Sequence, residues 1–290
     1  MDVQNCAPSV RFMISRVGVR GIKKPLRIER DGKQHILSSE IDLFVDLPET
    51  QKGSHMSRNA EVISEIVDSS VRNPMGSIED LAQTIARLLL ERHEYATRAE
   101  VYISADLFLD RLTPMGNRTL EPYVIFSRAV AGRDGRERRA IGIRVIGMTA
   151  CPCAMETVKG LVEEKYPELR VPEGAPFISH NQRNLVEIEL EGDVPGVNAE
   201  NLIVIAEASV SSPTFEILKR RGEGLVVLQA HENPRFVEDV VRTALDAILT
   251  AYPDLDGDTV VRVRSESEES IHKHTAYAER VSTLAELRIQ

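Results

Sequence analysis

The sequence contains no tryptophan, and aromatic residues make up only 4% of its 290 residues. Proteins that bind single-stranded nucleic acid stack bases on aromatic side chains, so this scarcity argues against such a platform. General nucleic-acid binders also carry a basic field, whereas this chain has a formal net charge of −9. We therefore expect no nucleic-acid partner. A nucleotide substrate is still compatible, because it needs only a local basic pocket.

Cysteine is also scarce: the chain has Cys6, Cys151 and Cys153. An odd and sparse set does not form a disulfide framework, and the last two are too close in sequence to staple much chain. We therefore interpret these cysteines as free thiols in a reducing compartment, used for chemistry or for metal binding, rather than as disulfide partners. The sequence also lacks an apolar run of about 18 residues and an N-terminal secretion signal. We therefore expect a cytoplasmic protein without a membrane partner.

The 42% hydrophobic content is enough for substantial cores, and 290 residues suit one large or two medium domains. Apolar residues recur with strand and helix periods in the order strands, helices, strands within each half of the chain. No sequence repeat accompanies this order. We predict an α+β protein built from two similar modules, residues 1–135 and 136–290.

Local signals place several helix ends and turns. Ser77, with Asp80 three residues later, predicts a helix that begins near residue 78. Asn233-Pro234 predicts a helix with the asparagine as N-cap and the proline in the first turn. We expect Asn73-Pro74 to end a helix and Asp31-Gly32 to form a turn between strands.

An alternating apolar strand around Ile141–Val145 leads into Gly147-Met-Thr-Ala-Cys-Pro-Cys-Ala154. A lone cysteine is often a small buried hydrophobe. Two thiols that flank a rigid proline are of more use as a metal ligand or a nucleophile. About thirty residues later, Ser179-His-Asn-Gln-Arg183 supplies an imidazole. Cysteine with histidine is a ligand combination that zinc or ferrous iron prefers.

Other polar residues have both an ordinary and a functional interpretation. Arg183 offers a planar fork for phosphate or makes a surface salt bridge. Glu238 lies at the edge of an apolar helix stripe, as a paired structural charge or a substrate-binding group. Glu223 lies in a charge run that would usually be a solvated turn. His55 and Arg58 are either residues at the start of a helix or anion ligands. His272 and His274 are either exposed histidines of the C-terminal tail or an HxH metal-binding pattern.

Taken together, the motifs resemble the type IB GTP cyclohydrolases over nearly the whole chain, from about Asp2 to His274. The matching segments are Cys151-Pro-Cys153, His180-Asn-Gln-Arg183, Asn233-Pro-Arg-Phe-Val-Glu-Asp239, Glu269-Ser-Ile-His272, Lys52-Gly-Ser-His-Met-Ser-Arg58 and Asp46-Leu-Pro48. Within the family, Gly147–Ala154 and Leu228-Gln-Ala-His-Glu-Asn-Pro234 look more like the archaeal branch, the ferrous-iron enzymes of methanopterin biosynthesis.

The resemblance implies a tunnelling fold with two tandem modules of antiparallel sheet, helices on one face, and assembly into a homodimer or homotetramer. It implies a metal site in the second module that binds Fe²⁺, with Zn²⁺ or Mn²⁺ as substitutes. Its implied ligands are Cys151, His180, Glu223 and His272. We expect Cys153 to serve in packing or to support the ligands without binding the metal itself. Around Glu223 the sequence Arg-Arg-Gly-Glu departs from the usual Arg-Pro-Asp-Glu. The segment before His272 is a few residues longer than in bacterial relatives, so His274 is an alternative ligand.

The resemblance also implies the reaction. GTP is the substrate, Glu238 holds the guanine edge, and catalysis depends on Cys151, His180 and Glu238. Hydrolysis at C8 releases formate, and ring closure gives 7,8-dihydroneopterin 2′,3′-cyclic phosphate. The implied donors to the triphosphate are Lys52, His55, Arg58 and Arg183.

Three other functions remain open from the sequence. A bacterial-type enzyme would release 7,8-dihydroneopterin triphosphate for folate synthesis. A tunnelling-fold relative such as a nitrile reductase would use a cysteine nucleophile without metal. A structural metal-binding protein would unfold when its metal is removed. Metal content and product mass distinguish these functions.

Overall fold

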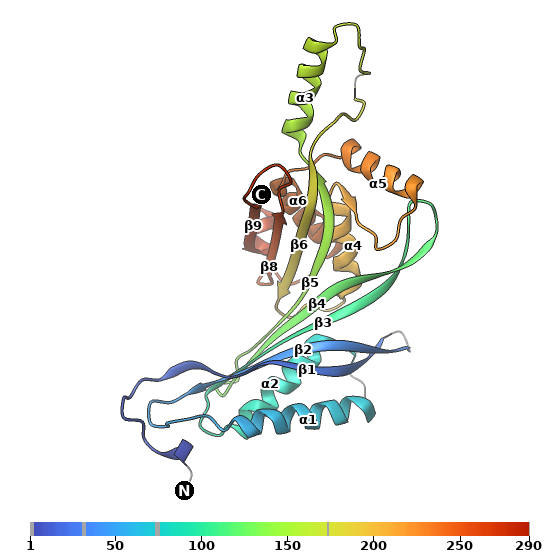
Figure 1. Cartoon of the computed structure of the whole chain (residues 1–290). Coiled ribbons are helices and arrows are strands. Elements are labelled where there is room, and N and C mark those ends of the chain that lie inside the picture. Colours follow the sequence, from blue (N-terminus) through green and yellow to red (C-terminus); the bar gives the residue numbers. More distant parts are fainter. Residues whose placement is uncertain (1–2, 31–32, 73–75, 173, 290) are drawn as a thin grey trace. The chain divides into compact units, whose positions relative to one another are not determined.

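The computed structural model describes all residues except 1–2, 31–32, 73–75, 173 and 290 (Figure 1). The chain divides into two compact units. Unit 1 comprises Met1–Leu107, Val124–Ile141 and Glu191–Asp193, and unit 2 comprises Phe108–Tyr123, Gly142–Leu190 and Val194–Gln290. The long middle strands contribute residues to both units. The predicted module boundary at residues 135 and 136 stays a prediction.

Unit 1 contains an antiparallel sheet and two helices. Its elements are η1 (Val3–Asn5), β1 (Ile14–Arg30), β2 (Lys33–Leu47), α1 (Met56–Arg72), α2 (Ile78–Arg92) and the unit 1 parts of β3 (Arg98–Leu112) and β4 (Arg118–Gly132). Strand β2 pairs with β1 on one side and with β3 on the other. Both helices lie on the same face of these strands (Figure 1). Their apolar stripes bury residues such as Ile63, Ile85 and Leu89.

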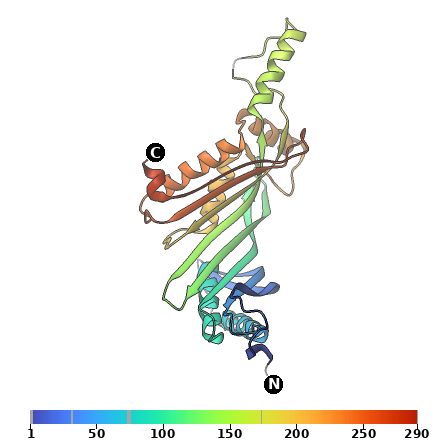
Figure 2. The same cartoon turned by 90° about the vertical axis from the view of Figure 1, so that its left-hand side faces the viewer.

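Unit 2 contains the other strands and the other helices. It contains most of β5 (Glu137–Ala150) and of β6 (Asn181–Glu191). Its other elements are α3 (Pro152–Lys165), α4 (Ala199–Ser209), β7 (Ser212–Pro213), α5 (Arg220–Glu232), α6 (Val237–Ala251), β8 (Val260–Ser267), β9 (Ala276–Thr283) and α7 (Leu284–Arg288). The sheet order is β5-β6-β8-β9, and β7 pairs with β5. Helix α6 runs along β8 and β9, and α4 packs beside α6 (Figure 2). The α+β class, with antiparallel sheet and helices on one face, is therefore confirmed.

Several local predictions can now be compared with the structure. Ser77 is the N-cap of α2, and its hydroxyl accepts a hydrogen bond from the Asp80 N–H at 3.1 Å. The prediction for Asn233 was wrong, because Asn233 is the C-cap of α5 and α6 begins at Val237. The Asn233 side-chain amide donates to the Val210 carbonyl at 3.2 Å, which turns the chain before the next helix. The predicted turn Asp31-Gly32 and helix end Asn73-Pro74 lie outside the described residues.

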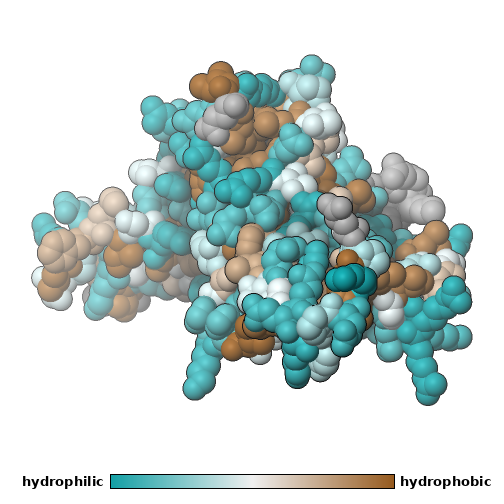
Figure 3. Space-filling model, turned by 90° about the horizontal axis from the view of Figure 1, so that it is seen from above, coloured by the Kyte–Doolittle hydropathy of each residue, from teal (hydrophilic) through white to brown (hydrophobic). Residues whose placement is uncertain are grey.

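The surface mixes hydrophilic and hydrophobic residues. On the face shown in Figure 3, hydrophobic residues are scattered among hydrophilic ones. In α3 the buried side chain is Met155, while Leu161 is 58% exposed. None of the described helices combines the length and apolar character that a membrane crossing requires.

Candidate active site

Cys151 lies where β5 ends and α3 begins. It is the N-cap of α3, and its sulfur accepts a hydrogen bond from the Ala154 N–H at 3.5 Å. Pro152 occupies the first helical position, where the missing N–H costs nothing. Cys151 is partly buried and Cys153 is exposed in the first turn. The sequence therefore places one thiol at a rigid strand-to-helix junction and the other on the helix surface.

The start of β6 brings His180 beside Cys151. The Cys151 N–H donates to the His180 carbonyl at 3.2 Å. The Ser179 hydroxyl donates back to the Cys151 carbonyl at 2.6 Å. These two hydrogen bonds tie together segments that are about thirty residues apart, and the predicted pairing of this thiol and imidazole in space follows from them.

Only one ring nitrogen of His180 is held by its neighbours. Nδ1 lies 2.9 Å from Gln182 Oε1 and 3.6 Å from Glu269 Oε2. Gln182 Nε2 in turn lies 3.3 Å from Glu269 Oε1, which orients the amide with its oxygen toward the ring. Because both ring partners are oxygen acceptors, Nδ1 carries a proton, and the neutral form of the ring then has its lone pair on Nε2. No described residue forms a hydrogen bond with Nε2, so it is available to a metal ion.

A buried polar network lies behind this histidine. Gln182 Nε2 is 3.3 Å from Thr149 Oγ1, which is 3.0 Å from Ser267 Oγ. Asn184 Nδ2 donates to Ser267 at 2.8 Å and to Ser265 at 2.9 Å. Satisfied networks of this kind are rigid, so the backbone that carries His180 is held in one position.

His272 and His274 lie near His180 on the loop between β8 and β9. The ring centroids of His180 and His272 are 6.4 Å apart, and His272 stacks on His274 at 5.0 Å. With metal–nitrogen bonds of about 2.0–2.1 Å, two imidazoles on one ion have centroids roughly 5 Å apart. The separation of His180 and His272 is therefore more than about 1 Å longer than two ligands of one ion require, and His274 contacts His272 by stacking.

The two predicted carboxylates lie on helices. Glu223 is exposed in the first turn of α5 and Glu238 is exposed in the first turn of α6. The Arg235 N–H donates to the Ala150 carbonyl at 3.0 Å, which brings the start of α6 next to the residue before Cys151. Glu238 lines a pocket of about 280 Å³ together with Leu245 and Arg280.

The predicted ligands do not form a complete metal centre as placed. Within the part of the chain that the structure describes, no three His, Cys, Asp or Glu side chains are grouped closely enough to hold an ion. Cys151 is joined to His180 by a backbone hydrogen bond, and the ring of His272 is 6.4 Å from that of His180, whereas the Glu223 side chain forms no hydrogen bond or ion pair with any of the three. The donor set of thiolate and imidazole nevertheless suits a borderline divalent metal.

The predicted phosphate donors separate into two groups. Arg183 is exposed on β6, one residue after buried Gln182, so its side chain points to the opposite face of the strand. Lys52, His55 and Arg58 belong to unit 1, at the start of α1. Each group is basic, but the two groups belong to different units.

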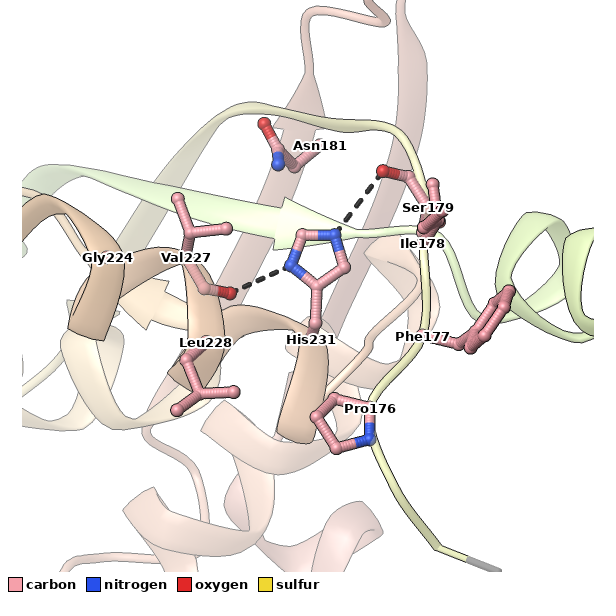
Figure 4. A pocket seen from close by; sticks show the side chains of 9 residues that line it. All are labelled: Pro176, Phe177, Ile178, Ser179, Asn181, Gly224, Val227, Leu228 and His231. Atoms are coloured by element: carbon pink, nitrogen blue, oxygen red, sulfur yellow. Dashed lines mark hydrogen bonds between the residues drawn. The ribbon is translucent and has the colours of Figure 1, made fainter. Parts of the chain in front are cut away.

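A larger pocket of about 630 Å³ lies between α5 and the segment Pro176–Asn181 (Figure 4). His231 closes it on one side: its Nδ1 is 2.8 Å from the Val227 carbonyl and its Nε2 is 3.3 Å from the Ser179 carbonyl. This histidine ties α5 to the residue before His180. The pocket wall is otherwise largely apolar, with Phe177 and Leu228 among its residues.

A family model described as "Type I GTP cyclohydrolase folE2" matches residues 1–278. The chain belongs to this family. It is 44% identical to the GTP cyclohydrolase MptA of Methanothermobacter thermautotrophicus, with 100% of this chain and 95% of the relative covered. The MptA of Methanosphaera stadtmanae is 42% identical, with 99% and 96% covered. The resemblance inferred from the motifs is thus confirmed, and with it the prediction of a GTP cyclohydrolase.

Solved structures of uricases share the fold of this chain. The uricase from Arthrobacter globiformis aligns with a TM-score of 0.51, 8% sequence identity, and 95% of each chain covered. A thermostable mutant named AgUricase gives 0.52 at 7% identity, with 93% of this chain and 91% of that chain covered. At such low identity the similarity shows the fold alone.

Three residues of this cyclohydrolase that the sequence did not single out hold other groups in place. Glu269 was part of a matching motif, but its contact with His180 bridges distant positions. His231 was likewise inside a quoted segment. His93 in unit 1 carried no signal, because a lone histidine in a polar segment is usually a surface residue. Their roles follow from partners far away in sequence.

Proposed function

We propose that the enzyme hydrolyses GTP at C8 of the guanine, releases formate and forms 7,8-dihydroneopterin 2′,3′-cyclic phosphate for a methanopterin-type pathway. The names and full-length similarity of the MptA relatives support this product. The observation that carries the proposal is His180, whose Nδ1 is held while Nε2 is open, hydrogen-bonded through its backbone to Cys151. A tunnelling fold in tandem modules, assembled as a homodimer or homotetramer, belongs to the same proposal.

We propose that Cys151, His180 and His272 hold Fe²⁺, with Glu223 as the fourth ligand and Zn²⁺ or Mn²⁺ as substitutes. Thiolate, imidazole and carboxylate groups are the donors that these ions accept. A divalent cation bound there supplies an acidified water as nucleophile near neutral pH. Glu223 would have to approach from the first turn of α5, whereas the bond from His231 to Ser179 links the other end of that helix to the site.

The remaining groups bind and orient the substrate. Glu238 accepts hydrogen bonds from the N–H donors on the pyrimidine edge of guanine, because an ionised carboxylate offers acceptors only. Gln182 and Glu269 retain the Nδ1 proton of His180 and so keep Nε2 directed outward. Lys52, His55, Arg58 and Arg183 neutralise the triphosphate through charge-assisted hydrogen bonds.

The test is reconstitution of metal-free protein with Fe²⁺ in the absence of oxygen, followed by addition of GTP. We expect formate, and a pterin that becomes fluorescent after oxidation. The mass of the product distinguishes the cyclic phosphate from the triphosphate of the bacterial-type reaction. The absence of pterin with every divalent metal tried would rule out the proposed activity.

A further inference from the structure

The loop Lys52–His55 leads into α1 and carries two of the proposed triphosphate donors. The N-terminal segment holds its backbone: the Lys52 N–H donates to the Cys6 carbonyl at 2.9 Å, and the Gly53 N–H donates to the Gln4 carbonyl at 3.1 Å. From the other side, the Ser54 hydroxyl lies 2.7 Å from the Tyr95 hydroxyl. Ser54 is only 5% exposed. The loop is therefore fixed on both sides.

Tyr95 is one member of a buried hydrogen-bonded chain that runs Ser54, Tyr95, His93, Asn59. The Tyr95 hydroxyl is 2.8 Å from His93 Nδ1, and His93 Nε2 is 2.8 Å from Asn59 Oδ1. His93 has no exposed surface, and Asn59 is 1% exposed. Asn59 Oδ1 can only accept, so His93 Nε2 carries the proton.

The position of that proton determines which group donates and which accepts in each hydrogen bond of the series Ser54, Tyr95, His93 and Asn59. Burial, with the nearby charges of Arg58 and His55, lowers the pKa of His93 to about 4, so the ring is neutral. Neutral Nδ1 then accepts from the Tyr95 hydroxyl, and the Tyr95 oxygen accepts from Ser54. Each of these hydrogen bonds then has one donor and one acceptor, so the hydrogen-bonded series has a single proton arrangement.

The loop and the first turn of α1 carry positive charge without acidic partners. The Lys52 ammonium forms no ion pair with any described residue. The Arg58 guanidinium donates to the Arg92 carbonyl at 2.8 Å and pairs with no described carboxylate. In a chain with a net charge of −9, two such cations at the start of one helix favour an anionic ligand.

We propose that Tyr95 and His93 are positioning residues that hold the Lys52–His55 loop in the geometry that binds a polyphosphate. The inference rests on the proposed GTP function and identifies which buried groups its phosphate-binding loop depends on. Neither residue touches the substrate. Their effect passes through the Ser54 hydroxyl to the backbone between Lys52 and His55.

The test compares GTP with guanosine, which lacks phosphates, on the metal-loaded full-length enzyme. Tyr95→Phe removes the hydroxyl that joins Ser54 to His93 and keeps the ring. We expect its KM for GTP to rise about tenfold, in line with the loss of two neutral hydrogen bonds. The inhibition constant of guanosine and kcat should stay within about twofold. Ser54→Ala should raise the KM similarly, and the double variant should add little, because both break the same chain.

Tyr166→Phe is the matched control, since Tyr166 is 50% exposed at the end of α3 and its hydroxyl makes no hydrogen bond with a described residue. A Tyr95→Phe enzyme that is less stable but keeps its KM for GTP would overturn the positioning role. Lys52→Ala tests separately whether the Lys52–His55 loop binds the phosphates of GTP. An unchanged KM for GTP in this variant would mean that the loop binds no phosphate, and the positioning role of Tyr95 and His93 would be wrong. Formate release by the unaltered enzyme would still stand in that case.

Discussion

The two units each contain a histidine in a buried polar network, and the two histidines differ in one respect. In unit 1, both ring nitrogens of His93 have hydrogen-bond partners, Tyr95 and Asn59, and the side chain has no exposed surface. In unit 2, His180 has partners on Nδ1 and none among the described residues on Nε2, and its side chain is 11% exposed. One network is closed and the other is open.

This difference supports a structural role for His93 and the ligand role that we propose for His180. A ring with both nitrogens satisfied and no solvent access can neither bind a metal nor exchange protons readily, so it serves to fix the backbone around it. A ring fixed at one nitrogen presents the other in a defined direction, which is the arrangement found around metal-binding histidines. The number of ring nitrogens that already have partners is therefore the property on which we distinguish the two histidines.

The largest expected effect comes from removing the open histidine. His180→Ala deletes a proposed ligand, so we expect bound metal to be lost and formate release to fall below detection. Because the ring is at the surface end of its network, the metal-free variant should unfold within about 1 kcal/mol of the metal-free parent. Elemental analysis, formate release and urea unfolding measure the three quantities. Retention of stoichiometric metal would show that His180 is not a ligand.

Replacement of His93, the histidine of the closed network, should leave metal binding intact and change stability. The effect should be clearest in how the free energy of unfolding depends on pH. The pKa of His93 is lowered from 6.5 to about 4, chiefly by burial. Below pH 6.5 the unfolded chain binds a proton at His93 that the folded protein does not bind. The free energy of unfolding is therefore highest above that pH and decreases as the pH falls toward 4. We expect a loss of about 2 kcal/mol between pH 6.5 and about pH 5 from this group.

His93→Gln removes the titrating ring, so the stability of the variant should fall less steeply with acid than that of the parent. Urea unfolding of both proteins at a series of pH values measures the difference, and other groups cancel in the subtraction. Metal content should be unaffected, in contrast to His180→Ala. Parallel pH curves for parent and variant would contradict a neutral buried His93.

Local sequence predicted helices and strands in both units better than it predicted the contacts between distant residues. The N-cap Ser77 and the strand before Cys151 depend on neighbouring residues, and both were predicted correctly. Helix α5 was missed because its first turns hold a charge run and two glycines, Gly222 and Gly224, which are poor helix formers. Buried Ala230 and the His231 bond to Ser179 stabilise it through tertiary contacts.

The misread Asn233 has a related cause. Asparagine is common at both ends of helices, and only the presence of α5, which ends at the preceding residue Glu232, decides between them. The partners of the two histidines were equally hidden, since Asn59 is 34 residues from His93 and Glu269 is 87 residues from Gln182. Motifs identified which residues to examine, and long-range packing determined which nitrogen each histidine leaves open.

The smallest predicted effect tests what keeps the open histidine in its orientation. Glu269 accepts from Gln182 Nε2 at 3.3 Å and lies 3.6 Å from the protonated Nδ1 of His180. In Glu269→Gln one of the two carboxylate oxygens becomes an NH₂ group, which faces a donor whichever way the amide turns. The Nδ1 contact or the Gln182 contact is then lost, and His180 is less firmly directed. Substitutions of such outer groups typically cost 10–100-fold in metal affinity.

Glu268→Gln is the matched control for this change. Glu268 precedes Glu269 and is exposed, and its backbone N–H donates to the Arg183 carbonyl at 2.9 Å. Metal affinity measured by competition with a chelator should fall in Glu269→Gln and stay unchanged in Glu268→Gln. Equal affinities in the two variants would mean that Gln182 alone orients His180. The open network would then depend on a neutral amide, as the closed network around His93 depends on Asn59.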